Sequence, residues 1–284
     1  MMIDIVTGYL DSWRGSNDST TISVEKVKEG KMPTVFLING FYSETAKDSS
    51  EWMPIVNKLY PDSEVVLVRW KSGNIINQMI DNLSGKAIYS VAQKYLTQRA
   101  LMLASLSATS ALRAISLPAT LAYVTFTLSQ FGYRWRKSFL ETENASRELA
   151  KIINSESKYD GCILMGHSLG AKVICHTLQK VTPSRVNHAY LLAGAVINKT
   201  ELWCNLLSKH NNLCITNCYS SNDLILRYAF PVGVISKIPA IGVSPLKCDQ
   251  SRVLDLDVTP SVGGHMKFKC EKLAITLAEE ANSL

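Results

Sequence analysis

The sequence predicts an α/β fold in which helices flank a mostly parallel central sheet. Along the chain, short apolar runs of strand length alternate with segments of helical periodicity. One such run, residues 162–165, leads directly into the motif Gly-x-Ser-x-Gly at residues 166–170, and a helical pattern follows at once. Strand, sharp turn and helix in this order form a nucleophile elbow, which holds a serine hydroxyl clear of the sheet. The motif therefore nominates Ser168 as a nucleophile.

The predicted strands are apolar, β-rich runs that are mostly bounded by turn residues. They are residues 21–27, 34–38, 64–70, 162–165, 188–194, 213–219 and 253–258, with a turn expected at 28–31. Helices are expected at 52–59, where Pro61 ends the pattern, directly after the elbow, at 203–207 and at 267–280. Strands separated by helices at this spacing pair in parallel.

The residues of the elbow itself fit its geometry. Gly166 and Gly170 leave room for a cramped turn and for close packing of strand and helix, where a Cβ would clash. Ser168 precedes a helix, whose first N–H groups favour developing negative charge. The alternative is a glycine-rich turn from strand to helix that carries an ordinary surface serine.

The long stretch between the strand at 64–70 and the elbow contains no convincing strand. Its pattern predicts helices at 74–99, 100–115, 117–136 and 138–155. Residues 114–131 carry no charge, apolar side chains recur there at helical spacing from Leu117, and an aromatic and basic cluster ends the run at Lys137. Three interpretations remain open: a helical cap over the site, a membrane-docking element between Leu117 and Lys137, and a transmembrane span.

Length and composition favour one α/β-hydrolase-sized domain over residues 1–284, with residues 74–137 as an apolar helical insertion within it. The formal charge of +6 is mild, and no basic run or aromatic-basic motif points to a nucleic-acid partner. The seven cysteines show no CxxC spacing, which favours buried free thiols over disulfides or zinc ligands. Because residues 1–14 also lack the pattern of a secretory signal, we expect a cytoplasmic protein that is either free or membrane-associated.

Chain order assigns the partners of Ser168. In an α/β-hydrolase fold the acid follows a late strand and the histidine follows the last one. Asp223 and His265 occupy those two places. Ser168 would attack, His265 would accept and return its proton, and Asp223 would orient the imidazole. The competing acids Asp255 and Asp257 lie within the last strand, and the competing histidines lie elsewhere: His167 in the elbow, His176 on the next helix, His188 at a strand start and His210 in a polar loop.

A second feature of this fold is the oxyanion hole. The backbone N–H of the residue after the nucleophile supplies one donor, and the loop after the first parallel strand supplies the other. These positions nominate the amides of Leu169 and Phe41. A plain turn at the end of the strand is the alternative for residues 39–43.

Three motifs together resemble a known family. They are the elbow with its following residues 166–174, the run Asn-Cys-Tyr-Ser-Ser-Asn-Asp at 217–223 and the run Ser-Val-Gly-Gly-His at 261–265. They resemble the family catalogued as domain of unknown function 726, whose eukaryotic members include transmembrane and coiled-coil domain proteins, over roughly Thr34 to the C-terminus. The resemblance implies an α/β-hydrolase fold, catalysis by Ser168, Asp223 and His265, and frequent membrane association through an apolar segment before the elbow. This chain differs in having only one or two weakened apolar helices there and no visible coiled coil.

The residues and the resemblance lead to one expected function. It is a serine hydrolase that cleaves carboxylic esters through an acyl-enzyme, without metal or organic cofactor, on a small-molecule or lipid substrate: a lipase, phospholipase or carboxylesterase. A catalytically inactive membrane adaptor that kept the fold, and a thioesterase or peptidase with the same triad, are the alternatives. The oligomeric state is left open.

Overall fold

The computed structural model describes residues 22–41, 43, 49–73, 117–234, 236–248 and 251–281. The chain divides into two compact units, residues 1–74 together with 136–284, and residues 75–135. The expected helices at 74–99 and 100–115 lie outside the described residues. The role of residues 74–137 as a cap or docking element stays a prediction.

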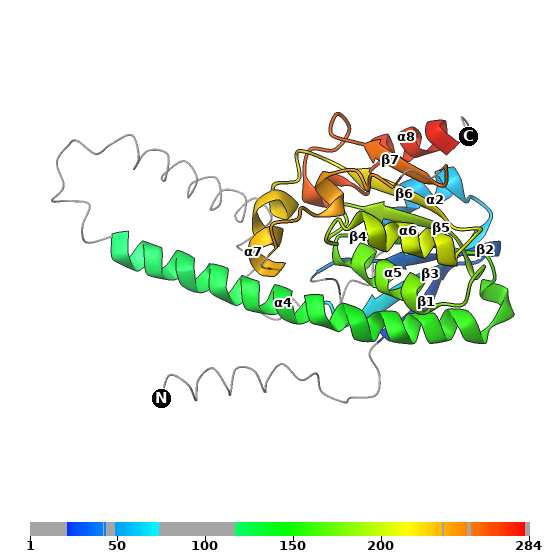
Figure 1. Ribbon diagram of the computed structural model, residues 1–284, viewed down its shortest axis with the longest axis horizontal. Coiled ribbons are helices and arrows are strands. Elements are labelled where there is room, and N and C mark those ends of the chain that lie inside the picture. The colour runs from blue at the N-terminus through cyan, green and yellow to red at the C-terminus, as the bar shows by residue number, and fades with distance from the viewer. Residues whose placement is uncertain are drawn as a thin grey trace. The chain divides into compact units, whose positions relative to one another are not determined.

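A seven-stranded sheet forms the centre of the larger unit, in the order β1-β3-β2-β4-β5-β6-β7 (Figure 1). The strands are β1 Ile22–Lys28, β2 Lys31–Ile38, β3 Ser63–Trp70, β4 Cys162–His167, β5 Val186–Leu192, β6 Cys214–Tyr219 and β7 Val253–Asp257. Only β1 is antiparallel, against β3, and every other pair is parallel. Val35 of β2 is aligned with Val65 on one side and Ile163 on the other, which brings the end of β2 beside the end of β4, the strand that leads into the elbow.

Helices cover both faces of the sheet (Figure 1). The longer ones are α2 Met53–Leu59, α4 Leu117–Ser155, α5 Leu169–Lys180, α6 Thr200–Lys209 and α8 Glu271–Ala281. Shorter elements are η1 Ser50–Trp52, η2 Ser157–Tyr159, the π-helical η3 Ile225–Ala229, α7 Phe230–Val234, η4 Ile241–Val243 and η5 His265–Lys267. Helix α2 packs against α8, whereas Lys209 of α6 bonds the last carbonyls of α5, so the helices form two groups.

The central strands are buried on both faces, which explains why they read as continuous apolar runs. Val35 to Ile38 are fully buried, and every residue of β4 is buried. These strands were therefore recognisable from apolar composition without any alternation. The mostly parallel sheet flanked by helices confirms the predicted α/β-hydrolase fold class.

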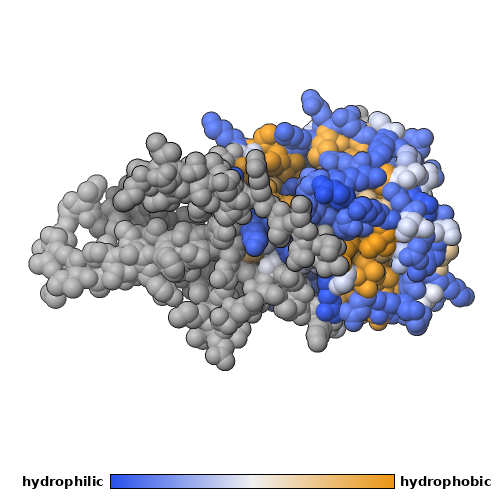
Figure 2. All heavy atoms as spheres, turned by 90° about the horizontal axis from the view of Figure 1, so that it is seen from below, coloured by the Kyte–Doolittle hydropathy of each residue, from blue (hydrophilic) through white to orange (hydrophobic). Residues whose placement is uncertain are grey.

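One helix boundary was predicted wrongly. Residues 117–136 and 138–155 form the single helix α4 rather than two. The sequence changes there from apolar to polar, but this alters the surroundings of side chains rather than the backbone, and after Pro118 no proline interrupts the helix. In the last turns of α4, Leu149 and Ile153 are buried. The described surface seen from below is mostly hydrophilic, with smaller hydrophobic patches (Figure 2). No helix in the described part of the chain is both long and apolar enough to cross a bilayer.

The cysteine prediction is wrong for one pair. Cys204 on α6 and Cys248 form a disulfide, with Cα atoms 6.1 Å apart. The two segments are held together by side-chain hydrogen bonds from Asn198 and Thr200 to the carbonyls of Pro245 and Leu246. The two cysteines are 44 residues apart in the sequence, so their spacing alone did not indicate a disulfide. Cys162, Cys175 and Cys218 are buried free thiols, as predicted.

Candidate active site

Ser168 stands at a strained turn between β4 and α5. Its backbone has φ 56° and ψ −117°, a region that a residue other than glycine rarely adopts. A Cβ on Gly166 would lie 2.7 Å from the Ala171 nitrogen, and one on Gly170 only 2.0 Å from the Ile38 carbonyl oxygen. Only glycine therefore allows α5 to approach β4 and β2 this closely, and the turn holds Ser168 in place.

The Ser168 hydroxyl belongs to a chain of three side chains. Its Oγ lies 2.9 Å from Nε2 of His265, and Nδ1 of His265 lies 2.6 Å from Oδ2 of Asp223. Since a carboxylate only accepts, Nδ1 of His265 carries the hydrogen, which leaves Nε2 free to accept from the serine. Asp223 is fully buried and Ser168 is 5% exposed. The structure thus brings together the three residues that the sequence nominated.

The loops that carry Asp223 and His265 are tied to each other. The second carboxylate oxygen of Asp223, Oδ1, accepts the N–H of Leu226 at 2.9 Å, which fixes the carboxylate plane. The neighbouring Asn222 donates its side-chain amide to the Thr259 carbonyl, 3.1 Å away, in the loop between β7 and His265. The acid and the histidine therefore keep their relative position through the backbone as well as through their own bond.

His167 supports the site in a way that the sequence analysis missed. Its Nε2–H donates to the backbone carbonyl of His265 at 2.8 Å, and the centres of the two rings lie 5.1 Å apart. Burial, then the nearby His265 and Lys269, hold the pKa of His167 well below its usual range, so the ring stays neutral. Its place at the end of β4, beside the ends of the neighbouring strands, was the available signal.

The loop after β2 lies directly against the serine. A Cβ on Gly40 would come 2.8 Å from Cβ of Ser168 and 3.4 Å from its Oγ. Asn39 is fixed by two indoles, since Nε1 of Trp52 donates to its Oδ1 at 2.7 Å and Nε1 of Trp70 donates to its carbonyl at 2.9 Å. Phe41, the predicted donor, follows Gly40 in this loop.

Leu169 occupies the other predicted oxyanion position. It is the first residue of α5 and fully buried, and its N–H is one of the first helical donors, which have no partner within the helix. The donor roles of Leu169 and Phe41 stay predictions.

The competing acids and histidines have other partners. Oδ1 of Asp255 accepts from Asn217 and from the N–H of Leu246, and Asp257 accepts from the N–H of Thr259. Of the other histidines, His176 contacts Lys172, His188 contacts Thr216, and His210 contacts the carbonyl of Leu178. Among the described residues, Asp223 is therefore the acid that bonds the histidine beside Ser168.

The sheet order, the elbow and the helices on both faces define a protein with the α/β-hydrolase fold. The chain belongs to the family described as "Protein of unknown function (DUF726)", whose model matches residues 18–279. A comparison with curated protein sequences finds no match.

Solved structures with this fold are similar to the chain at low identity. A predicted CIB-like hydrolase from Thermoplasma acidophilum is 12% identical, covers 93% of both chains and has a TM-score of 0.43. The mouse alpha/beta hydrolase domain-containing protein 10 is 11% identical, with 94% of this chain and 96% of that one covered and a TM-score of 0.44. A monoacylglycerol lipase from Paleococcus ferrophilus is also 11% identical, with 93% and 99% covered and a TM-score of 0.44.

Proposed function

We propose that the protein is a serine hydrolase that cleaves carboxylic esters. The observation that carries the proposal is the continuous chain from Ser168 Oγ through His265 to the buried Asp223. Nucleophile, base and orienting acid lie within hydrogen-bond reach of one another, which is the arrangement that activates a serine. The positive φ of Ser168 supports it, because strained backbone of this kind is found preferentially at functional sites.

The chemistry follows from the geometry. Ser168 Oγ attacks the acyl carbon while Nε2 of His265 takes its proton, and the carbonyl oxygen becomes an oxyanion. His265 then gives that proton to the departing alcohol, which leaves the acyl group on Ser168. A water molecule, deprotonated by the same nitrogen, attacks the acyl-enzyme, and the proton returns to Ser168 as the acid departs. Asp223 keeps the imidazole in the required tautomer throughout, and the N–H groups of Leu169 and Phe41 would receive the oxyanion.

The proposed substrate is a lipidic or acyl-chain ester. The uncharged stretch at residues 114–131 supports this, because such a segment suits an acyl chain or a membrane surface. Within this proposal, peripheral membrane contact runs through the segment between Leu117 and Lys137.

Hydrolysis of p-nitrophenyl esters from acetate to laurate tests the proposal. The wild type should cleave the series with kcat/KM rising with chain length, and Ser168→Ala should lose turnover. The matched control is Ser155→Ala, at an exposed serine that bonds only within α4, and it should keep wild-type rates. If folded wild type shows no turnover with or without liposomes, the ester-hydrolase proposal fails and the non-catalytic adaptor is favoured.

A further inference from the structure

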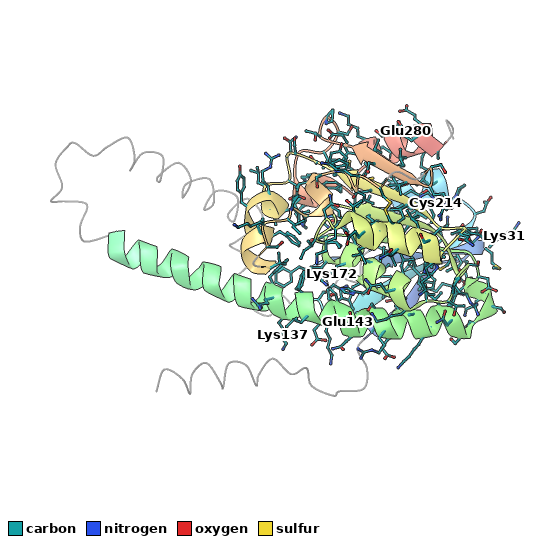
Figure 3. The ribbon with its side chains drawn as sticks, viewed as in Figure 1. Lys31, Lys137, Glu143, Lys172, Cys214 and Glu280 are labelled. Carbon is teal, nitrogen blue, oxygen red and sulfur yellow. A yellow bond between two sulfur atoms is a disulfide. The ribbon has the colours of Figure 1, made fainter. Side chains whose placement is uncertain are left out.

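A second cluster of ionisable side chains lies on α5, one helical turn after Ser168, and takes no part in the proposed reaction. Nζ of Lys172 lies 2.5 Å from Nε2 of His176, and Nδ1 of His176 lies 3.0 Å from Oε2 of Glu143 on α4. The other carboxylate oxygen of Glu143 pairs with Lys180 at 2.8 Å. Figure 3 labels Lys172 and Glu143, which come from these two neighbouring helices.

Lys172 is partly buried and lines a cavity of about 180 Å³ that is open to solvent on one side. Its walls combine apolar and basic side chains, and they include Phe139, Val196, Leu202, Lys172, His176 and Lys199. None of the described lining residues carries a carboxylate. An engineered apolar cavity of about 150 Å³ in another protein holds benzene, so this space suits a group of about six carbon atoms.

The charge of the cavity is one-sided. Nζ of Lys172 lies 4.1 Å from the centre of the Phe139 ring and 2.5 Å from Nε2 of His176, and neither group carries a negative charge. His176 accepts from Lys172, and burial followed by the charge of Lys172 lowers the pKa of His176 to about 4, so the ring is neutral at pH 7. Glu143, the nearest acid of the cluster, is shared with Lys180.

Lys172 is partly desolvated, and among the lining residues it has the Phe139 ring but no carboxylate to offset its charge, so an anion that enters the cavity would stabilise it. Consistent with this, burial lowers the pKa of Lys172 to about 8 although Glu143 acts in the opposite direction. Lys199 also lines the cavity and is exposed, so it adds a second positive charge where the cavity meets solvent.

We propose that this cavity binds a small amphipathic monoanion, a carboxylate with a short apolar chain. The carboxylate would pair with Lys172 inside the cavity and with Lys199 at its rim, and the chain would contact Phe139, Val196 and Leu202. The site is separate from the triad, since none of Ser168, Asp223 and His265 lines it. The inference goes beyond the proposed hydrolysis and does not need it.

Hexanoate is a suitable probe because it fits the volume, stays monomeric in solution and is not an ester. Its binding to the wild type is measured by calorimetry or by ligand-observed NMR, with hexanol as the neutral analogue and acetate as the analogue without the chain. Hexanoate should bind at least about tenfold more tightly than either, since both the charge and the chain contribute.

Single substitutions test whether hexanoate binds in this cavity. Lys172→Met keeps the length of the side chain and removes its charge, and it should weaken hexanoate binding at least about tenfold. Lys199→Gln, at an exposed residue whose change spares the fold, should weaken it about threefold. The matched control Lys151→Met removes an exposed lysine of α4 outside the cavity and should bind like the wild type. Ser168→Ala should also bind normally, which separates this site from product binding at the triad.

The pH dependence adds an independent test. The charged and titratable groups that face Lys172 are His176, Glu143, Lys180, Lys199 and the Cys175 thiol, whose pKa burial raises to about 12. Hexanoate should bind more tightly at pH 6.5 than at pH 9.5, because Lys172 loses its proton between them, and Lys172→Met should flatten that dependence. The proposal is overturned if hexanoate does not bind the folded wild type, if hexanol binds as tightly, or if folded Lys172→Met keeps full affinity.

Discussion

Two chains of carboxylate, imidazole and a third polar group lie at the two ends of the first turn of α5, yet they differ in how the carboxylate is held. Asp223 is fully buried, and each of its oxygens has one partner: His265 and the N–H of Leu226. Glu143 is 44% exposed at its side chain; one of its oxygens lies 3.0 Å from Nδ1 of His176 without forming a hydrogen bond, and the other pairs with Lys180. The first acid is hydrogen-bonded to its imidazole, whereas the second pairs with a lysine.

The third member differs in a second respect. Ser168 sits at a strained turn with its hydroxyl close to the loop after β2, whereas Lys172 lies in regular helix and lines a cavity. A buried acid that is hydrogen-bonded to the imidazole, and a third member held at a strained turn, distinguish the first chain from the second. The proposed function assigns catalysis to the first chain on these two differences.

Replacing each of the two histidines by alanine should give the largest difference in kcat. His265→Ala should lower kcat for ester hydrolysis by about 10⁴-fold or more, as expected when the base of such a triad is lost. His176→Ala should stay within about twofold of the wild type. A large loss in His176→Ala, measured on protein of native circular dichroism, would mean that the second chain takes part in the hydrolysis.

Replacing each of the two acids by its amide should give a somewhat smaller difference in kcat than the histidine variants. Asp223→Asn should lower kcat about 10³- to 10⁴-fold, because the amide can hold the imidazole in the wrong tautomer. Glu143→Gln should leave kcat unchanged, since Glu143 contacts no member of the triad. Steady-state kinetics at saturating ester checks both, and equal rates for Asp223→Asn and the wild type would remove Asp223 from the mechanism.

Backbone support of the first chain should have an intermediate effect. His167→Phe keeps a ring but leaves the His265 carbonyl without its donor, a loss of about 1–3 kcal/mol. We expect kcat roughly tenfold lower with KM little changed, and partial recovery in His167→Gln, which restores an N–H. A KM effect alone, or equal rates in both variants, would assign His167 a purely structural role.

The smallest effect concerns protonation of the second chain. The folded pKa of His176, about 4, lies below the unfolded value of about 6.5, so the unfolded state binds more protons between these values. Stability from this group is therefore present above pH of about 6.5 and is lost as the pH falls toward 4. Histidine NMR titration should find His176 neutral at pH 6, and urea unfolding of His176→Gln should show a shallower loss in acid. Titration of His176 near its ordinary pKa would contradict the account of the cavity.

The parts of the molecule that the sequence predicted are those with local signals. The buried strands are continuous apolar runs. The turn from β4 to α5 is indicated by two glycines, Gly166 and Gly170, because backbone atoms lie too close to them for any Cβ. Chain order alone placed Asp223 and His265, because parallel strands end at one edge of the sheet.

The missed features depend on long-range contacts. His167 acts on a carbonyl far along the chain, and Cys204 meets Cys248 only because two loops are bonded together. The Lys172 cavity is lined by residues from α4, α5, α6 and the segment after β5, so it could not be predicted from any single stretch of sequence. The uninterrupted α4 was missed for another reason, since a change of composition was mistaken for a helix end.

Covalent labelling with a fluorophosphonate, followed by mass spectrometry of the labelled peptide, tests the central claim most directly. The account predicts one adduct on Ser168 in the wild type, none in Ser168→Ala, strongly slowed labelling in His265→Ala and normal labelling in Lys172→Met. An unlabelled, folded wild type in buffer, detergent and liposomes, or an adduct on another residue, would contradict it.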